Sequence, residues 1–191
     1  MADPRFDRLR RLLREKACRF GAADEFVLAS GQRSDAYVDG KLLTLSSAGA
    51  GLVAELLWER IAAYRPDAVG GVVIGADPII GALLAYLSRV NLPLTGFLVR
   101  KEAKGHGTRK SVEGPRPAVD RPRVVTVDDV VTTGASTLVA IQRVRQEWSA
   151  DVLAAVAIVD REAGAAEAFA AEGVKFHALF KLSELREAAP S

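Results

Sequence analysis

Short apolar runs that alternate with segments of helical spacing constrain this chain most strongly. Four runs rich in valine, isoleucine and leucine are expected to form strands, at residues 69–74, 94–99, 123–127 and 152–159. They lack the alternation of apolar and polar residues that a half-exposed strand shows, so both faces of the sheet should be covered. Strand, helix and strand in repetition give right-handed crossovers and a mainly parallel sheet. The sequence therefore predicts an α/β fold with helices on both faces.

Helices are expected between and before these strands, at residues 4–20, from Ser46 or Ser47 to about Tyr64, at 79–89 and at 136–148. The first is amphipathic, because apolar residues recur at helical spacing between arginines. Either serine can cap the second helix, and the sequence Arg65-Pro66-Asp67 should end it. A terminal strand is expected around His177, a residue to which the sequence gives no functional role.

The stretch from Ala68 to Leu87 is apolar enough to suggest a membrane span. It carries a single charge, Asp77, and is long enough to cross a bilayer. Glycines and the pair Asp77-Pro78 interrupt it, so we expect a buried strand, a tight turn and a buried helix. One cysteine, Cys18, excludes an internal disulfide, and the charged N-terminus lacks an apolar signal segment. Both features favour a cytoplasmic protein.

Positive charge is concentrated between Arg100 and Arg123. Eight lysines and arginines stand against three acids there, whereas the chain of 191 residues carries a formal net charge of only +2. The remainder is slightly acidic, which argues against a protein that binds nucleic acid by neutralising phosphates. Residues 100–122 contain few apolar side chains but several glycines and prolines, so a long loop without regular structure is expected. Such a loop is typical of a lid or a binding segment.

The segment from Val124 to Thr137 carries the strongest chemical signal. An apolar strand ends there in two adjacent acids, Asp128 and Asp129, and a hydroxyl-rich turn then opens a helix. Ligands of open parallel sheets bind beyond the carboxyl ends of the strands. Backbone N–H groups and the positive dipole end at the start of that helix suit a phosphate. Hydroxyl donors are added by Thr132, Thr133, Ser136 and Thr137.

Two acids beside a phosphate site would repel the phosphate itself. We therefore expect Asp128 and Asp129 to face ribose hydroxyls or a hydrated Mg²⁺. The chain has neither GxxxxGK[ST] nor GxGxxG, which argues against nucleoside triphosphate hydrolysis and dinucleotide binding. A simpler alternative is that both acids only cap a turn and the start of a helix.

The segment 124–137 resembles the phosphoribosyl pyrophosphate (PRPP) loop of the type I phosphoribosyltransferases. The stretch from Val99 to Gly107 resembles the mobile catalytic loop of the orotate phosphoribosyltransferase family, whose core pattern is R-K-x-x-K-x-H-G. The two motifs stand about as far apart as in that family, and the resemblance runs from about Phe26 to Lys181. It implies a type I phosphoribosyltransferase fold, with a small hood over the carboxyl edge of a mainly parallel sheet.

The resemblance also implies roles for particular residues. Asp128 and Asp129 would hold the ribose 2- and 3-hydroxyls, as catalytic residues. The 5-phosphate would be wrapped by Val130, Val131, Thr132, Thr133, Gly134, Ala135 and Ser136. The diphosphate would be bound by Arg100, Lys101, Lys104 and His106. Orotate would contact Thr132 and Arg161, because a guanidinium matches the carboxylate that distinguishes orotate from uracil.

The implied reaction transfers phosphoribose from PRPP to orotate, giving orotidine 5-monophosphate and diphosphate. Leaving diphosphate gains negative charge, which Lys104 would stabilise electrostatically, while His106 would donate a proton. Mg²⁺ is the expected cofactor, held mainly through substrate and water rather than by direct protein ligands. By analogy with the family, the chain would form a homodimer in which this loop reaches the other subunit's active site.

We expect one phosphoribosyltransferase domain over residues 1–191. Its core would span about 45–162 and its hood about 1–44 and 163–187, with a mobile loop at about 100–120. Two stretches depart from the family pattern. Gln32 and Arg33 stand where many members have a lysine, which makes Arg33 the candidate replacement cation. The turn from Gly75 to Gly81 stands where some members have Tyr-Lys.

Two other functions remain open from the sequence. A purine or uracil phosphoribosyltransferase would share the segment 128–137 but has no reason to carry the lysines and histidine of 101–106. A nucleotide-sensing regulator that binds RNA or DNA would need a basic face outside the loop, and the rest of the chain is slightly acidic.

Overall fold

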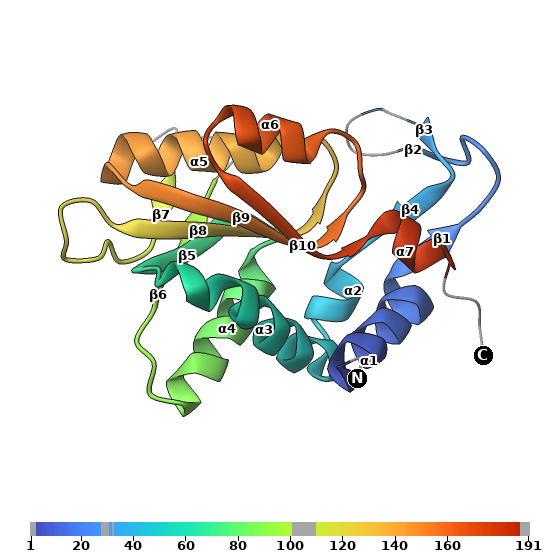
Figure 1. Cartoon of the computed structure of the whole chain (residues 1–191), viewed down its shortest axis with the longest axis horizontal. Helices are drawn as coiled ribbons and strands as arrows, with labels where there is room; N and C mark the ends of the chain where they lie inside the picture. Colours follow the sequence, from blue (N-terminus) through green and yellow to red (C-terminus); the bar gives the residue numbers. More distant parts are fainter. Residues whose placement is uncertain (1–2, 28–30, 32, 101–109, 188–191) are drawn as a thin grey trace.

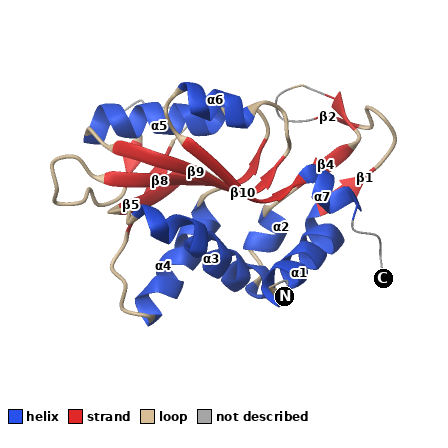
Figure 2. Cartoon of the chain, viewed as in Figure 1, coloured by secondary structure: helices blue, strands red, loops and turns tan. Residues whose placement is uncertain are grey.

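The computed structural model describes residues 3–27, 31, 33–100 and 110–187 (Figure 1). Its centre is a six-stranded sheet in the order β10-β9-β8-β5-β6-β7, shown in red in Figure 2. Neighbouring strands run parallel, except that the edge strand β7 pairs antiparallel with β6. The strands are β5 (Ala68–Val72), β6 (Thr95–Val99), β7 (Val112–Glu113), β8 (Arg123–Val131), β9 (Asp151–Asp160) and β10 (Lys175–Lys181). The predicted mainly parallel α/β fold is confirmed.

Helices cover both faces of this sheet, as Figure 2 shows. One face carries α3 (Ser47–Ile61) and α4 (Asp77–Arg89), and the other carries α5 (Ala135–Trp148) and α6 (Ala165–Ala171). Successive side chains of a strand point to opposite faces. Accordingly, fully buried Val125 packs in the core under α3 and α4, while its neighbour Val124 packs in the core under α5. Two covered faces explain why the strands lack polar alternation.

The short elements gather at one end of the sheet, to the right in Figure 1. They are α1 (Pro4–Leu12), the π-helix η1 (Leu13–Ala17), β1 (Cys18–Phe20), β2 (Phe26–Val27), β3 (Arg33–Ser34), β4 (Ala36–Val38), α2 (Lys41–Thr44) and α7 (Leu182–Glu187). A 3₁₀ turn, η2 (Ala62–Tyr64), follows α3. The helix predicted over 4–20 is too long, because Cys18–Phe20 pair antiparallel with Ala36–Val38 instead. Tertiary pairing overrides the helical pattern there.

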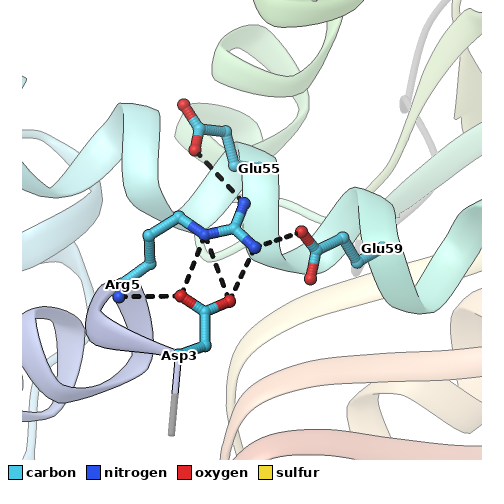
Figure 3. A network of polar contacts seen from close by, with 4 residues as sticks. All are labelled: Asp3, Arg5, Glu55 and Glu59. Carbon is cyan, nitrogen blue, oxygen red and sulfur yellow. Dashed lines mark hydrogen bonds and ion pairs between the residues drawn. The ribbon is translucent and has the colours of Figure 1, made fainter. Parts of the chain in front are cut away.

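An ion-pair network fixes α1 against α3 (Figure 3). Asp3 caps α1 by accepting from the Arg5 N–H at 2.9 Å. The Arg5 guanidinium lies 2.6 Å from Asp3, 2.6 Å from Glu59 and 3.6 Å from Glu55. Exposed ion pairs contribute little one by one, but here three carboxylates share one arginine. The network supplements the packing of Leu9, a core side chain of α1.

Several predicted boundaries agree with the structure and two need correction. Ser46 caps α3, accepting from the Gly49 N–H at 3.2 Å, as predicted. Strand β8 continues to Val131, beyond its predicted end, because its last residues pair with β9. The loop expected to lack regular structure contains β7, paired through Val99 and Val112. The rest of that loop includes residues 101–109, which lie outside the described residues. Within the described chain no helix has the length and apolarity to cross a membrane.

Candidate active site

The turn between β8 and α5, residues 131–136, forms what we call the phosphate cradle. Gly134 adopts a left-handed backbone with φ 79°, and a Cβ there would lie 2.8 Å from the ring of Phe169. Only glycine fits both conditions. As the N-cap of α5 it supplies no side-chain acceptor, so the first N–H groups of the helix are available to an anion. Thr133, Ala135 and Ser136 are exposed around them.

Asp128 and Asp129, which we call the acid pair, lie inside the last part of β8 and are both buried. Asp128 accepts from the Thr137 hydroxyl at 3.0 Å and from the Asp129 N–H at 3.0 Å. Burial, followed by the charge of Asp129, raises the pKa of Asp128 to about 7. The two carboxylates therefore form a buried acceptor site that holds a proton near neutral pH.

A lysine that sequence reasoning missed completes this site. Lys41 Nζ lies 2.8 Å from Oδ1 of Asp39 and 3.7 Å from Oδ2 of Asp129. The hydrogen bond to Asp39 raises the pKa of Lys41, and the charge of Asp129 adds to that effect. No local pattern singles out Lys41, because it follows a polar turn and meets the acid pair only in the folded chain.

Two glycines allow other backbone segments to approach the acid pair. A Cβ at Gly75 would lie 2.7 Å from Oδ1 of both Asp128 and Asp129. A Cβ at Gly40 would lie 2.7 Å from Cβ of Asp129. Real Cβ atoms essentially never lie this close to another heavy atom, so a side chain at either position would force the acid pair to shift. The turn before α4, in which the Val73–Ile74 peptide bond is cis, is thus brought directly against the carboxylates. Burial raises the pKa of Asp77, the first residue of α4.

Beside the phosphate cradle lies a pocket of about 370 Å³, which we call the Arg161 pocket. This volume falls within the ~300–1,000 Å³ of small-molecule sites. The pocket brings together Thr132, Arg161 and Arg33, three residues singled out from the sequence. It is lined by Arg33, Ser34, Asp35, Thr132, Arg161, Glu162, Ala163, Leu182, Ser183 and Arg186. Gln32, the neighbour of Arg33, lies outside the described residues.

Arg161 is held in place by the N-terminal segment. Its Nη2 donates to the Ser34 hydroxyl at 2.9 Å and to the carbonyl of Ala36 at 2.9 Å. Its backbone N–H donates to the carbonyl of Val131 at 2.8 Å, which joins it to the phosphate cradle. Burial and then the charge of Arg186 lower the pKa of Arg161. Both effects disfavour the charge of the guanidinium, and an anionic ligand in the pocket would compensate that charge.

The far wall of the Arg161 pocket comes from α7 and was not predicted. Arg186 pairs with Asp35, and its guanidinium lies 5.3 Å from the centre of the Phe20 ring. Glu162 accepts from the backbone N–H of Ser183 at 2.9 Å and from its hydroxyl at 3.1 Å. These contacts join the two ends of the chain around the pocket. Sequence patterns carry no signal for contacts over such separations.

The remaining predicted residues fall into two groups. Arg100 is described: its Nε lies 3.0 Å from Glu113, and it lines a small apolar hollow with Ala135 and Ser136. It therefore stands next to the phosphate cradle. Lys101, Lys104 and His106 lie outside the described residues. His177 lies 2.6 Å from the Tyr64 hydroxyl in a different pocket.

Comparisons with known proteins agree on one family. No family model matches the chain. It is 39% identical over 180 residues to an orotate phosphoribosyltransferase of Aquifex aeolicus, covering 94% of this chain and 96% of that one. It is 43% identical over 162 residues to one of Rhodopseudomonas palustris, covering 84% and 86%.

Solved structures give the same result. The Mycobacterium tuberculosis orotate phosphoribosyltransferase in complex with PRPP matches with a TM-score of 0.75 and 31% identity, covering 96% of this chain and 99% of that one. A phosphoribosyltransferase from Corynebacterium diphtheriae matches with a TM-score of 0.81 and 34% identity, again covering 96% and 99%.

Proposed function

This chain belongs to the orotate phosphoribosyltransferase family, and we propose that its reaction takes place where the phosphate cradle, the acid pair and the Arg161 pocket meet. As a member it is a pentosyltransferase: it transfers the phosphoribosyl group of PRPP to orotate and releases diphosphate, in the synthesis of pyrimidine nucleotides. The question is then how its own residues would perform that transfer.

One observation carries the placement of the two substrates. Thr132 belongs to the phosphate cradle and also lines the Arg161 pocket. A phosphoribosyl group bound at the cradle would therefore have its reacting carbon close to a base in the pocket. Holding both reactants in one arrangement can supply a large part of the rate enhancement of such a displacement.

The phosphoribosyl group would be held at two points. The N–H groups at the start of α5, with the hydroxyls of Thr133 and Ser136, would bind the 5-phosphate. The acid pair would accept hydrogen bonds from the ribose 2- and 3-hydroxyls, which favours its fully ionised form. Thr137 supports this arrangement because its hydroxyl fixes the Asp128 carboxylate.

Orotate would bind in the Arg161 pocket through its carboxylate. Among the described residues both side-chain hydrogen bonds of Arg161 use Nη2. Nη1 and Nε therefore remain to donate hydrogen bonds to a ligand. Both bidentate edges of a guanidinium include Nη2, so a carboxylate bound by two parallel hydrogen bonds would take the place of the Ser34 or Ala36 contact. Before the ligand arrives, these two contacts would hold the guanidinium at the pocket.

The departing diphosphate would be stabilised by the basic segment. Arg100 lies beside the start of α5, on the side of the phosphate cradle toward β6. We assign Lys101, Lys104 and His106 to the same task on the strength of the family motif. Negative charge grows on the diphosphate as the bond to the sugar breaks, so these cations would bind the transition state more tightly than the ground state.

The donors present suit Mg²⁺ held together with the substrate. Among the described residues no three His, Cys, Asp or Glu side chains gather as a metal site, but the acid pair offers two carboxylates beside the ribose position. Magnesium prefers such oxygens and keeps several waters and substrate phosphates as ligands. When bound, it would neutralise diphosphate charge.

The family resemblance supports three further proposals. The chain would act as a homodimer whose segment 101–109 contributes to the partner's site, and it would work in the cytoplasm, in keeping with its single cysteine. Residues 45–162 would form the catalytic core, with a hood from 1–44 and 163–187. In the described parts of that hood, Ser34 and Arg186 line the Arg161 pocket.

A spectrophotometric assay tests the function. Purified protein is incubated with PRPP, Mg²⁺ and orotate, beside reactions with uracil, hypoxanthine and adenine. We expect turnover of orotate alone. Turnover of another base would keep the phosphate cradle but overturn the assignment of the Arg161 pocket, and PRPP binding without any turnover would favour a nucleotide sensor.

A further inference from the structure

The helix that begins at the phosphate cradle also holds the chain on either side of residues 101–109. Arg143 of α5 donates to the carbonyl of Arg100, the last described residue before that segment. Glu147, one turn further on, binds Ser111 and Val112, which follow it. One helix is thus bonded to both stems of the segment that carries Lys104 and His106.

Glu147 makes three hydrogen bonds to its stem. Its Oε1 accepts from the Ser111 N–H at 2.8 Å and from the Ser111 hydroxyl, and its Oε2 accepts from the Val112 N–H at 3.2 Å. Ser111 is buried although it stands in a polar, glycine-rich part of the chain. Burial alone would raise the pKa of Glu147, but the Ser111 and Val112 bonds outweigh it and hold that pKa below its usual value. The carboxylate is therefore ionised, and such charge-assisted bonds are the stronger kind.

The two stems are also joined to each other. The Arg100 N–H donates to the Ser111 carbonyl at 2.9 Å, and Arg100 Nε lies 3.0 Å from Glu113. Val99 pairs with Val112 in the β6–β7 ladder. Glu147 therefore holds two stems that are already bonded to each other, and not one free strand.

The anchor and the phosphate cradle share one face of α5. Ser136, Val139, Arg143 and Glu147 follow one another at intervals of three, four and four residues, so they line up along the helix. Ser136 and Val139 border the hollow that Arg100 lines. An α-helix is a stiff spacer of 1.5 Å per residue, so its register sets where the stems stand relative to the cradle.

We propose that Glu147 is a positioning residue for phosphoribosyl transfer: by holding Ser111 and Val112 on α5, it fixes where the chain enters and leaves residues 101–109, and so the point from which that segment reaches the site it serves, in this subunit or in its partner. The proposal rests on the proposed function, because the placement affects the reaction only through the cations that the segment carries. Misplacing a catalytic group by about 1 Å costs up to ~10²-fold in rate.

The test compares Glu147→Ala and Glu147→Gln with a matched control on the same helix. Glu172→Ala removes an exposed partner of α5, since Glu172 pairs with Arg145 at 3.0 Å, but it touches neither stem. We expect Glu147→Ala to lower kcat about tenfold or more with KM for orotate within about twofold of wild type. Glu147→Gln keeps one acceptor and should recover part of the rate, while Glu172→Ala should stay within about twofold.

Ser111→Ala provides a second route if Glu147→Ala does not fold. It removes one bond and keeps both backbone donors, so a smaller fall in kcat is expected. Hydrogen exchange at the Ser111 and Val112 amides gives a readout independent of activity. It should accelerate in Glu147→Ala, less in Glu147→Gln, and not in Glu172→Ala. The proposal would be overturned if the kcat of Glu147→Ala or Ser111→Ala were no lower than that of Glu172→Ala. Unchanged amide exchange in Glu147→Ala would overturn it as well. Absent wild-type turnover would instead overturn the proposed function and leave the exchange result to decide the anchoring.

Discussion

Lys41 Nζ lies 3.7 Å from Oδ2 of Asp129, so a cation from the N-terminal segment stands against the acid pair of β8. The contact joins two parts of the chain that sequence analysis treats separately. It also gives the acid pair a counter-charge that does not depend on a ligand.

PRPP binding should release a proton around neutral pH. The pKa of Asp128 is raised to about 7, whereas ribose hydroxyls bind the ionised carboxylate. Affinity should therefore fall below pH 7, by at most about tenfold per pH unit. Calorimetric titration in buffers with different ionisation enthalpies measures the proton directly. Asp128→Asn should abolish the release, and release that persists in this variant would assign it to another group.

The stability of the ligand-free protein should fall as pH rises, whereas its affinity for PRPP should rise. Because the pKa of Asp128 lies above its ordinary value of 3.8, the folded state binds the proton more tightly than the unfolded state. This contribution is present at low pH and is lost as pH rises from about 4 to 7. Asp128→Asn should accordingly have a higher Tm than wild type at pH 8 and lose that advantage by pH 4. Parallel thermal scans across this range provide the test.

Gly75→Ala and Gly81→Ala form a matched pair. Gly75 lies in the turn that precedes α4, and Gly81 lies within α4. A Cβ at Gly75 would lie 2.7 Å from both carboxylates of the acid pair, whereas nothing stands within 4 Å at Gly81. Gly75→Ala should weaken PRPP binding at least tenfold by displacing the acid pair. Gly81→Ala lies in the helix and should raise stability by about 1 kcal/mol without changing affinity. Equal PRPP affinity in the two variants would exclude the close packing described above.

Arg161→Ala should raise KM for orotate while leaving KM for PRPP nearly unchanged. Hydrogen bonds to a charged group contribute about 1.5–3 kcal/mol, which is roughly a tenfold to 150-fold change. Arg161→Lys should not restore binding, because an ammonium lacks the planar set of donors with which a guanidinium can bind Ser34, Ala36 and a carboxylate through different nitrogens. Steady-state kinetics with each substrate varied in turn separates the two parameters.

Lys104→Ala should show the reverse pattern. If Lys104 acts on the departing diphosphate, its loss should lower kcat by about two to three orders of magnitude, with KM for orotate little changed. Steady-state kinetics beside Arg161→Ala makes the comparison direct. Similar effects of both variants on both parameters would contradict this division of roles.

The parts of the molecule that were predictable are local in sequence. The strands, the Ser46 cap and the turn at Gly134 follow from patterns within a few residues, and the segment 124–137 is continuous. By contrast, Lys41 and Arg186 acquire their positions only when distant segments meet. The strand β7 escaped prediction for the same reason: two residues in a glycine-rich stretch pair only because β6 offers an edge.

The contact between Arg186 and Asp35 spans 151 positions along the chain. The phosphate cradle, in contrast, is a single turn between two adjacent elements. Contacts over long separations carry the larger entropy of loop closure, and chains rich in them fold slowly. The cradle can therefore take shape as soon as β8 and α5 dock, while the Arg161 pocket must await the meeting of both ends. During folding, this chain should acquire its site for the sugar phosphate before it acquires its ability to choose a base.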